Sequence, residues 1–270
     1  MSWKGQPEMC GIAGYSLSAS SRVEQTLAAQ ALLAGIAERG ADAVGYAYVT
    51  PAGEIAIHKQ RSGASALLDQ VVLSTSASEV LVHVRDYTKG HPRIEANNHP
   101  VRHGAVVGIH NGHIDNDEEL MERYGFARAE PEMSVDSEVI FAVAEANGST
   151  AHGFEEFRGS LATAWLDERE PDLLYLARGV GRPLWVGTTR RELFFASTRE
   201  ALEIAEHYTG LRLRKRQVHE GKLAAFKGSR AVRIENFVPD PTYEPDPLPA
   251  VRAPHEGAFC LERLALIAAA

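Results

Sequence analysis

The sequence has few cysteines and no long apolar run. Only two of its 270 residues are cysteine, Cys10 and Cys260, and they lie far apart. Two cysteines are too few for a disulfide framework, which excludes a disulfide-stapled secreted scaffold and favours a reducing cytoplasm. No apolar stretch approaches the roughly 20 residues that a membrane-spanning helix needs. The first nine residues carry one lysine and no apolar segment, so they do not form a secretory signal.

The sequence also lacks an excess of positive charge. Its formal net charge is -8, which excludes nonspecific attraction to nucleic acid or to an anionic membrane surface. The apolar fraction, 44%, is that of an ordinary globular protein. A chain of this length and composition can bury a substantial core without disulfides or metals.

Short apolar runs separated by turn residues predict strands in hairpin order, with helices inserted between them. Strands are expected at residues 9–15, 45–49, 54–58, 80–84, 105–110, 160–166, 173–177, 184–187, 193–196, 222–226 and 230–234. Helices are expected at residues 23–37, 67–72, 115–123, 136–146 and 200–207. Without a steady βαβ alternation, this order predicts an α+β fold with antiparallel sheets covered by helices.

We expect one domain over residues 10–235, because no repeat or low-complexity block interrupts it. Residues 1–9 form an extra N-terminal segment, either a propeptide or the result of a misassigned start. Residues 236–270 form a proline-rich tail, with six prolines between 239 and 254. The tail is expected to run extended over the surface, and residues 261–270 could form a short helix or fray.

Cys10 stands at the head of the first predicted strand, directly after Met9. A cysteine in that place is a candidate nucleophile. The alternative is a small buried hydrophobic residue, which is the commonest role of a free cysteine. Taken alone, the residue favours the second interpretation.

Further segments support the first interpretation. Four of them together resemble the class II glutamine amidotransferase domain, a member of the N-terminal nucleophile hydrolases: Met9-Cys10-Gly11-Ile12, His83-Val84-Arg85-Asp86-Tyr87-Thr88-Lys89-Gly90, His110-Asn111-Gly112 and Val135-Asp136-Ser137-Glu138-Val139-Ile140. Weaker matches lie at residues 38–45, at Asn97-Asn98-His99-Pro100, at Gly181-Arg182-Pro183-Leu184 and at Glu220-Gly221. The resemblance runs from Cys10 to about Phe226.

The resemblance implies a four-layer αββα sandwich with two mostly antiparallel sheets. It also implies that the domain hydrolyses the side-chain amide of L-glutamine through a cysteine thioester, without a cofactor. By the same resemblance, Cys10 is the nucleophile and the Asn111 side chain and Gly112 N–H form the oxyanion hole. Arg85 and Thr88 would bind the α-carboxylate of glutamine and Asp136 its α-amine. Arg39, Lys89 and His99 are assigned supporting roles.

The same residue types are what the chemistry needs. A free amino acid presents one anion and one cation, so its pocket requires a fixed arginine and a fixed carboxylate. An N-terminal cysteine carries its own α-amine, whose unperturbed pKa of about 7.7 to 8.0 lets it act as base. While residues 1–9 are attached, that nitrogen is an amide. We therefore expect either translation from Met9 followed by its removal, which we favour, or cleavage of a propeptide after Met9.

Simpler structural roles exist for several of these residues. Asn111-Gly112 could be an ordinary turn, Asp136 could cap the helix that it begins, and Arg39 could form a surface salt bridge. The loop after Arg85 also departs from the family pattern, because its aromatic residue is shifted by one place and Lys89 replaces a histidine. This departure puts loop closure over glutamine in doubt more than hydrolysis.

No metal site is expected, because the histidines between residues 99 and 113 lack the spacing of a ligand set. The expected partner is a separate synthase subunit that accepts the ammonia, since no phosphate-binding or acceptor module follows the predicted domain. Two other functions fit the residues: an N-terminal nucleophile amidase acting on a γ-glutamyl or other amide, and a catalytically silent glutamine sensor.

Overall fold

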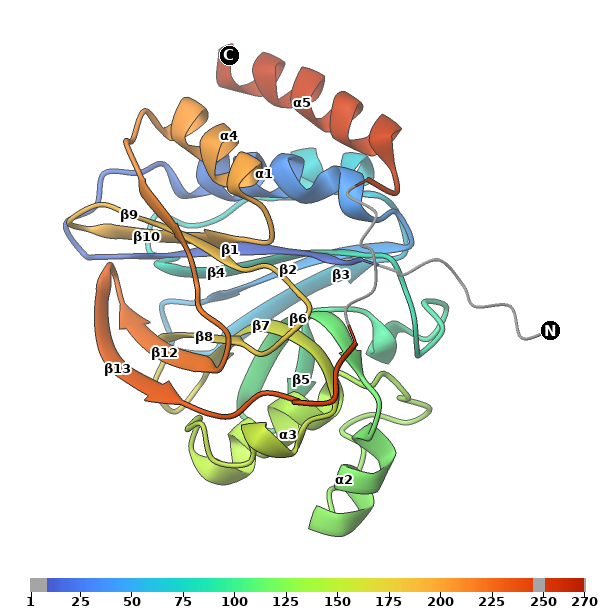
Figure 1. Ribbon diagram of the computed structural model, residues 1–270. Helices are drawn as coiled ribbons and strands as arrows, with labels where there is room; N and C mark the ends of the chain where they lie inside the picture. Colours follow the sequence, from blue (N-terminus) through green and yellow to red (C-terminus); the bar gives the residue numbers. More distant parts are fainter. Residues whose placement is uncertain (1–8, 245–250, 270) are drawn as a thin grey trace.

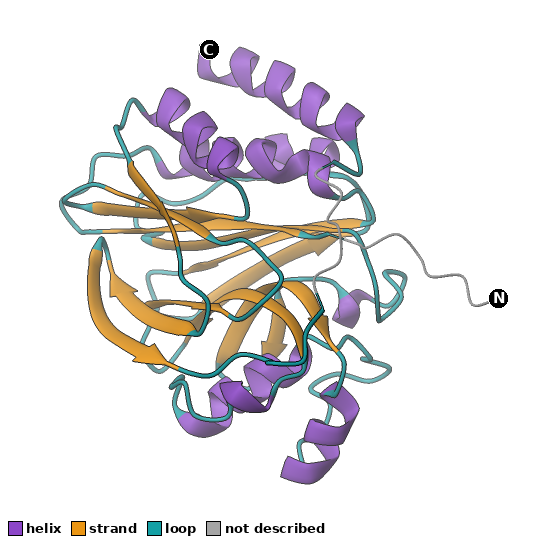
Figure 2. Cartoon of the chain, in the orientation of Figure 1, coloured by secondary structure: helices purple, strands orange, loops and turns teal. Residues whose placement is uncertain are grey.

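The structure, a computed structural model, describes residues 9–244 and 251–269. Most of the N-terminal segment 1–9 and part of the proline-rich tail, residues 245–250, lie outside the described residues. Two sheets stack face to face, with helices on both outer sides (Figures 1 and 2). Within the described residues, the strand pairs of both sheets are antiparallel. The predicted α+β sandwich is confirmed.

The larger sheet has seven strands in the order β11-β9-β10-β1-β4-β2-β3. Its central strand, β1, is buried along its whole length between β10 and β4. Cys10 directly precedes β1, so the candidate nucleophile sits at the end of a fully buried central strand. The strands are β1 (Gly11–Leu17), β2 (Ala43–Val49), β3 (Ile55–Gln60), β4 (Glu79–Arg85), β9 (Trp185–Thr188), β10 (Glu192–Ala196) and β11 (Arg214–Gln217).

The smaller sheet has six strands in the order β13-β12-β8-β7-β6-β5. Its longest pairing joins β6 to β7, from Val106 opposite Asp167 to Ile114 opposite Gly159. The strands are β5 (Val101–His103), β6 (Val106–Ile114), β7 (Gly159–Asp167), β8 (Leu174–Arg178), β12 (Lys222–Lys227) and β13 (Arg230–Asn236).

Strand β6 corrects one sequence-based expectation. The apolar pattern placed the end of this strand at residue 110, but the backbone pairing continues to Ile114, with Asn111 opposite Ala162 and Gly112 opposite Leu161. Gly112 holds a positive φ of 147° inside the ladder, and a Cβ there would lie 2.0 Å from the Ser160 carbonyl oxygen. Polar side chains ended the apolar pattern while the hydrogen-bonded ladder continued, so the interpretation of Asn111-Gly112 as a turn is wrong.

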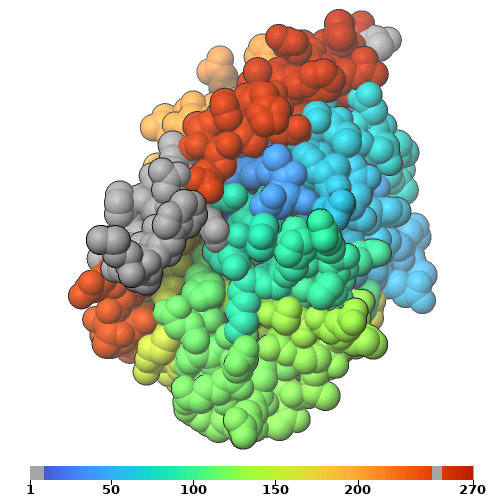
Figure 3. All heavy atoms as spheres, turned by 90° about the vertical axis from the view of Figure 1, so that its right-hand side faces the viewer, coloured from blue at the N-terminus to red at the C-terminus, as the bar shows by residue number. Residues whose placement is uncertain are grey.

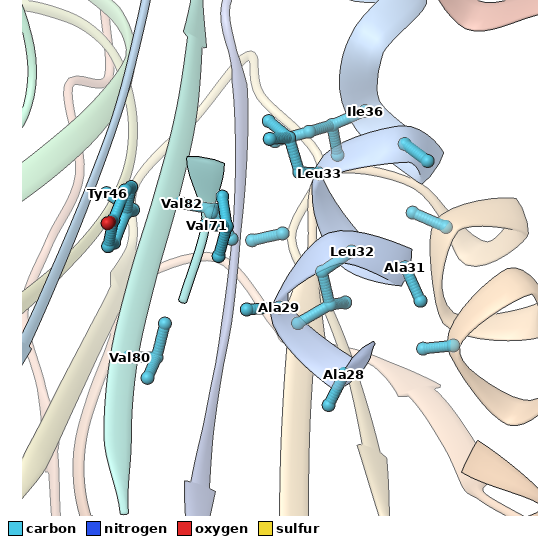
Figure 4. Close-up of a cluster of buried hydrophobic side chains, with 14 of the residues drawn as sticks. Ala28, Ala29, Ala31, Leu32, Leu33, Ile36, Tyr46, Val71, Val80 and Val82 are labelled. Atoms are coloured by element: carbon cyan, nitrogen blue, oxygen red, sulfur yellow. The ribbon is translucent and has the colours of Figure 1, made fainter. Parts of the chain in front are cut away.

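Helices α1, α4 and α5 cover the larger sheet, and α2 and α3 lie on the side of the smaller one (Figure 1). In Figure 4 the side chains of α1, among them Leu32, Leu33 and Ile36, point toward the sheet strands that carry Val80 and Val82. A second cluster fills the space between the sheets and a third packs α3 on the smaller sheet. The helices are α1 (Gln25–Ile36), α2 (Asp117–Tyr124), α3 (Glu138–Asn147), α4 (Arg199–Thr209) and α5 (Pro254–Ala269).

The C-terminal helix α5 is longer than expected, because it begins at Pro254 and not at residue 261. Cys260 and Leu264 on its inner side are fully buried in the cluster beneath α1 and α4. Arg252 and Ala253, just before the helix, donate backbone hydrogen bonds of 2.9 and 2.8 Å to the Glu38 carbonyl oxygen. The end of the chain therefore packs against the turn that follows α1, and Figure 3 shows this red segment against blue residues of the early chain.

Short elements account for the other differences. Strands β5 and β11 were not predicted, and the helix expected at residues 67–72 is replaced by two 3-10 turns, Ala64–Ala66 and Leu68–Gln70. Three more 3-10 turns lie at Ala37–Arg39, Glu95–Asn97 and Phe154–Glu156. Strand β11 lies at the outer edge of the larger sheet and reads Arg-Lys-Arg-Gln. A strand without apolar residues gives no hydrophobic signal.

No helix in the described part of the chain has both the length and the apolar character needed to cross a lipid bilayer.

Candidate active site

The thiol of Cys10 lies just before the first residue of the central strand β1, beside the loop that follows β4. Its Sγ is 3.5 Å from the Asp86 carbonyl oxygen, which accepts a hydrogen bond from the thiol. Burial raises the pKa of the Cys10 thiol to about 11, against the opposing effects of this hydrogen bond and of the Arg85 charge. The thiol is therefore protonated at neutral pH, and nucleophilic attack requires a base.

Met9, the residue before the candidate nucleophile, is as deeply buried as the residues of the core. It is 3% exposed, and its amide N–H donates to Asp86 Oδ2 at 3.1 Å. The Arg39 Nη2 group lies 3.4 Å from the Met9 sulfur. With Met9 attached, the nitrogen of Cys10 is a peptide amide and cannot accept the proton of the thiol.

Arg39 lies in the 3-10 turn after α1 and points into the protein. Its Nε donates to the Cys10 carbonyl oxygen at 3.0 Å, and the residue is only 3% exposed. The surface salt bridge considered as an alternative is therefore wrong. Burial lowers the pKa of Arg39 to about 10, which leaves the guanidinium charged at neutral pH.

Arg85 is the last residue of β4 and is 2% exposed. Its guanidinium donates to Asn98 Oδ1 at 2.6 Å, to the Lys89 carbonyl oxygen at 2.7 Å and to the Gly90 carbonyl oxygen. All of these acceptors are neutral, and Arg85 forms no ion pair with any described residue. A buried cation surrounded by neutral acceptors favours an incoming carboxylate. Thr88 is exposed on the loop that the guanidinium holds.

Asp136 precedes α3 and is 2% exposed. Its Oδ2 accepts a hydrogen bond of 2.7 Å from the Ile114 N–H and lies 3.3 Å from His113 Nδ1. Burial alone would raise the pKa of this carboxyl, but the hydrogen bond from His113 and the nearby charges of His110 and His113 lower it below its usual value. The group is therefore an ionised carboxylate.

The expectation that Asp136 caps α3 is wrong. The residue in the cap position is Ser137, and no side chain accepts a capping hydrogen bond there. The Asp136 carboxylate bonds to strand β6 instead, because the segment before the helix crosses the end of that strand.

Asn111 is fully buried in β6, and neither the oxygen nor the nitrogen of its side-chain amide has a hydrogen-bond partner. Buried amides in folded proteins are almost always paired. The next residue, Gly112, lines the pocket that contains Cys10. Two donor groups thus follow each other on one strand, and the second of them, Gly112, lines the pocket of the thiol.

Lys89 and His99 both line the pocket that contains Cys10. The Lys89 Nζ group forms ion pairs with Asp117 at 2.8 Å and with Glu118 at 2.9 Å, which ties the loop to α2. His99 is 3% exposed and stacks on His83 with 4.3 Å between ring centroids. Burial holds the pKa of His99 well below its usual value, so the ring is neutral.

One narrow cavity joins most of these groups. Of the nine predicted site residues, seven line it: Cys10, Arg85, Thr88, Lys89, His99, Gly112 and Asp136. Arg39 and Asn111 are not among the lining residues, although Arg39 bonds to Cys10 and Asn111 adjoins Gly112 in the chain. The lining also includes residues that the sequence did not single out for a role, namely Asp86, Tyr87, His110, Val135 and Ser137.

Asp86 and His110 could have been noticed from their position alone, because each adjoins a predicted site residue. Asp86 follows Arg85, and His110 precedes Asn111. His113, which holds Asp136, gave no signal, since the contact joins two segments 23 residues apart. Within residues 9–244 and 251–269, no group of three histidine, cysteine, aspartate or glutamate side chains is placed to hold a metal ion.

A stacked pair of antiparallel sheets between helices, with a cysteine at the end of the central strand, defines the N-terminal nucleophile hydrolase architecture. The solved glutamine phosphoribosylpyrophosphate amidotransferase from B. subtilis, complexed with ADP and GMP, superimposes with a TM-score of 0.66 at 18% identity, covering 84% of this chain and 49% of that one. A glutamine aminotransferase class-II domain protein from Silicibacter pomeroyi superimposes with a TM-score of 0.51 at 16% identity, covering 85% of this chain and all of that one. At these identities the likeness shows the fold.

The particular family follows from the sequence comparisons. Residues 88–204 match the family described as "Glutamine amidotransferase domain". The glutamine–fructose-6-phosphate aminotransferase (isomerizing) of Shigella flexneri is 32% identical over 207 residues, which is 72% of this chain and 32% of that protein. That of Haemophilus ducreyi is 31% identical over 215 residues, 74% of this chain and 33% of that protein. This chain therefore carries a glutamine amidotransferase domain of class II, a class of enzymes, and spans about a third of these relatives.

Proposed function

We propose that the chain hydrolyses the side-chain amide of L-glutamine to glutamate and ammonia through a thioester on Cys10. The observation that carries the proposal is a single cavity in which the Cys10 thiol, the unpaired cation of Arg85 and the ionised carboxylate of Asp136 meet. These groups match the amide and the two charged ends of free glutamine. No cofactor is needed for this reaction.

Glutamine is oriented by its ends. Arg85 grips the α-carboxylate through the two parallel N–H groups of its guanidinium, and the Thr88 hydroxyl adds a further hydrogen bond. Asp136 pairs with the α-ammonium. Lys89 keeps the loop in place through its ion pairs with α2, and the neutral ring of His99 packs beside the site. Arg39 fixes the backbone of the nucleophile through its bond to the Cys10 carbonyl oxygen.

The chemistry begins once residues 1–9 have been removed. The α-amine of Cys10 then takes the thiol proton, directly or through a water, and sulfur attacks the carboxamide carbon. The Asn111 side-chain N–H and the Gly112 backbone N–H stabilise the oxyanion. The protonated amine returns the proton to the leaving nitrogen, the C–N bond breaks and ammonia departs. Water then attacks the thioester, which releases glutamate and restores the thiol.

The names of the relatives bear on the fate of the ammonia. They are named for the transfer of nitrogen from glutamine to fructose 6-phosphate, and this chain covers about a third of their length. We propose that the ammonia made here passes to a separate synthase subunit. We also propose residues 10–235 as the catalytic domain, with 1–9 and 236–270 outside it, and a cytoplasmic location, which the two free cysteines support.

The direct test is to measure glutamate and ammonia release from glutamine with a chain whose Cys10 is confirmed as first residue by intact mass. We expect turnover that falls to background in C10S and C10A. The matched control is C260A, which changes the other cysteine, on the buried side of α5, and should retain turnover. A wild-type protein that binds glutamine but shows neither turnover nor alkylation of Cys10 by diazo-oxo-norleucine would identify a silent sensor instead.

A second substrate separates hydrolysis of glutamine from a broader amidase activity. A γ-glutamyl anilide keeps the amino acid head group that Arg85 and Asp136 bind but carries a bulky leaving group. The Cys10 cavity is narrow and leaves little room for that group. We expect kcat/KM for glutamine to exceed that for the anilide by at least about tenfold, a difference of about 1.4 kcal/mol. A higher value for the anilide would favour the γ-glutamyl amidase.

A further inference from the structure

A second cavity lies beside the Cys10 pocket and is lined by none of the groups to which the proposed reaction assigns a role. Its volume is about 370 Å³, within the range of small-molecule sites. His113, Ser160 and Arg182 line its inner wall, and Arg158, Thr242 and Tyr243 lie around it. The His113 ring lies 3.3 Å from Asp136, and the Ser160 carbonyl oxygen lies 3.2 Å from His110 Nε2. The two cavities therefore share a wall.

The unusual group in this cavity is Arg182, which is 6% exposed. Its Nη1 donates to the Gly181 carbonyl oxygen at 3.0 Å and to the Tyr243 hydroxyl at 3.3 Å, while its Nε has no hydrogen-bond partner. Among the described residues it forms no ion pair with a carboxylate. Burial of an unpaired charge is costly, so buried arginines are normally paired.

The surroundings add positive charge near Arg182. Its charge contributes to the lowered pKa values of Arg39 and His110, which places all three in one electrostatic neighbourhood. Arg158 is exposed at the rim, and its guanidinium donates to the carbonyl oxygens of Glu155 and Phe157. Two guanidinium groups that line the same cavity thus lack a carboxylate partner within ion-pair distance.

The carboxylates that line the cavity are mostly engaged elsewhere. Asp240 accepts hydrogen bonds from the Gly159 N–H and from the N–H and hydroxyl of Thr242. Asp115 lies 3.3 Å from His113 Nε2. Glu244 is exposed at the outer end of the described segment. None of them neutralises Arg182 at its inner wall.

We propose that this cavity binds the oxyanion group of a small molecule, a phosphate monoester or a carboxylate, with Arg182 as its main ligand and Arg158 at the rim. A guanidinium offers paired N–H donors that match either group. The Tyr243 hydroxyl already bonds to Arg182 and stands where it would adjoin the bound anion. The binding is independent of the proposed hydrolysis of glutamine, because it involves neither Cys10 nor Arg85.

The test uses the full chain without glutamine. Inorganic phosphate and succinate are titrated at constant ionic strength, with chloride as the balancing anion, and binding is followed by calorimetry and by the melting temperature. We expect saturable binding of at least one probe. A response to phosphate alone indicates a phosphate ester as the ligand, and a response to succinate indicates a carboxylate.

The variants locate the site. R182Q should weaken binding by at least about tenfold and R158Q by about threefold, since the first removes the buried donor and the second a screened one. R190Q, which changes an exposed arginine elsewhere, should leave binding unchanged, and so should R85Q, which changes the cation of the Cys10 pocket. In chloride alone, R182Q should melt at or above the wild-type temperature, because it relieves an unpaired buried charge.

Three results would overturn the proposal. One is a wild-type protein with no saturable response to either probe. Another is a response that persists in R182Q and R158Q, or one that only R85Q removes, because both place the anion elsewhere. The last is a lower melting temperature of R182Q in chloride without any anion response in the wild type, which identifies a purely structural arginine. If R182Q does not fold, R182K and R158Q carry the same comparison.

Discussion

Asn111 is buried in the middle of a strand with both atoms of its side-chain amide unpaired. A buried amide without partners costs on the order of 1 to 3 kcal/mol. A folded chain that keeps such a group on a strand, next to a residue that lines the Cys10 pocket, holds a donor that is ready before the substrate arrives. In the proposed reaction this donor meets negative charge that develops only in the transition state, where it has most effect on rate.

N111A tests this role. We expect kcat for glutamine hydrolysis to fall about 10²- to 10³-fold, because one oxyanion donor is lost, while KM changes by less than about threefold. The matched control is N236A, which removes an exposed asparagine side chain at the end of β13. A large rise in KM with kcat unchanged would assign Asn111 to substrate binding instead.

Glu79, the first residue of β4, is a buried carboxyl outside the site. It is 2% exposed and accepts hydrogen bonds from the hydroxyls of Ser16 and Ser78. Burial raises the pKa of Glu79 from its ordinary value of 4.5 to about 7. The folded protein therefore keeps this proton over a range where the unfolded chain has lost it.

The consequence is a loss of stability as pH rises. The contribution of Glu79 is fully present below pH 4.5, and it declines up to about pH 7, by about 3 kcal/mol in total. Urea unfolding at pH 5 and at pH 8 measures this loss. Between these two pH values, the free energy of unfolding of E79Q should fall by about 3 kcal/mol less than that of the wild type. The control E54Q changes an exposed carboxylate and should follow the wild type. Equal losses in E79Q and wild type would contradict the assignment.

Among single residues, the sequence predicts members of the site where a residue type is tied to a chemical role. The family resemblance singled out Cys10, Arg85 and Asp136, whose types match the thiol, cation and anion that amide hydrolysis of an amino acid needs, and the structure brings them to one cavity. Their partners were not predicted. His113 and Asp86 act through contacts between distant segments, which no local pattern records.

Helix α5 shows how an element can be set by its packing more than by its own sequence. The segment after Pro254 was expected to be a short helix or to fray, because only its last ten residues gave a helical pattern. Its burial of Cys260 and Leu264 against the helices on the larger sheet supplies the stabilisation that an isolated helix of this length lacks.

Two leucines of α5 give a matched comparison. Leu264 is fully buried, whereas Leu266, two residues on, is 63% exposed. L264A should lower the free energy of unfolding by about 3 kcal/mol, since it leaves a cavity, and L266A should change it by less than about 0.5 kcal/mol. Chemical denaturation measures both. Equal effects of the two substitutions would mean that α5 does not pack on α1 in solution.

Strands and helices with apolar faces were predicted in the right order, and the two-sheet sandwich followed from that order together with the family resemblance. The misses are elements without an apolar signal. Strand β11 is basic, β5 has three residues, and the polar end of β6 hid the continuation of its ladder. Hydrogen bonds to a neighbouring strand define these elements, and a single sequence does not reveal the neighbour.

For the whole molecule, the segment before β1 and the segment before α5 meet at one side chain. Asp86 accepts the Met9 N–H at 3.1 Å and the Arg252 Nε at 2.9 Å. The segment before α5 and the segment before the nucleophile are thus held together. Removal of residues 1–9 leaves the Arg252 contact in place while it frees the amine of Cys10.

We expect activity to follow that removal. A gene that starts at Met9 should yield a protein whose intact mass begins at Cys10, and its kcat/KM for glutamine should rise with pH through the α-amine pKa, about 7.7 to 8.0. A protein that retains residues 2–9 should have less than about 1% of this rate, because its Cys10 nitrogen is an amide. Full activity in a chain that retains those residues would exclude the amine as the base.

Strand β11 forms the outer edge of the larger sheet, so one row of its backbone N–H and C=O groups has no partner strand among the described residues. In many proteins such groups pair with a strand from another molecule. Here that edge carries Arg214, Lys215 and Arg216, of which Arg214 and Arg216 are exposed. Two such edges repel each other, so concentrated solutions should stay free of fibrous aggregates at low ionic strength and lose that protection when salt screens the repulsion.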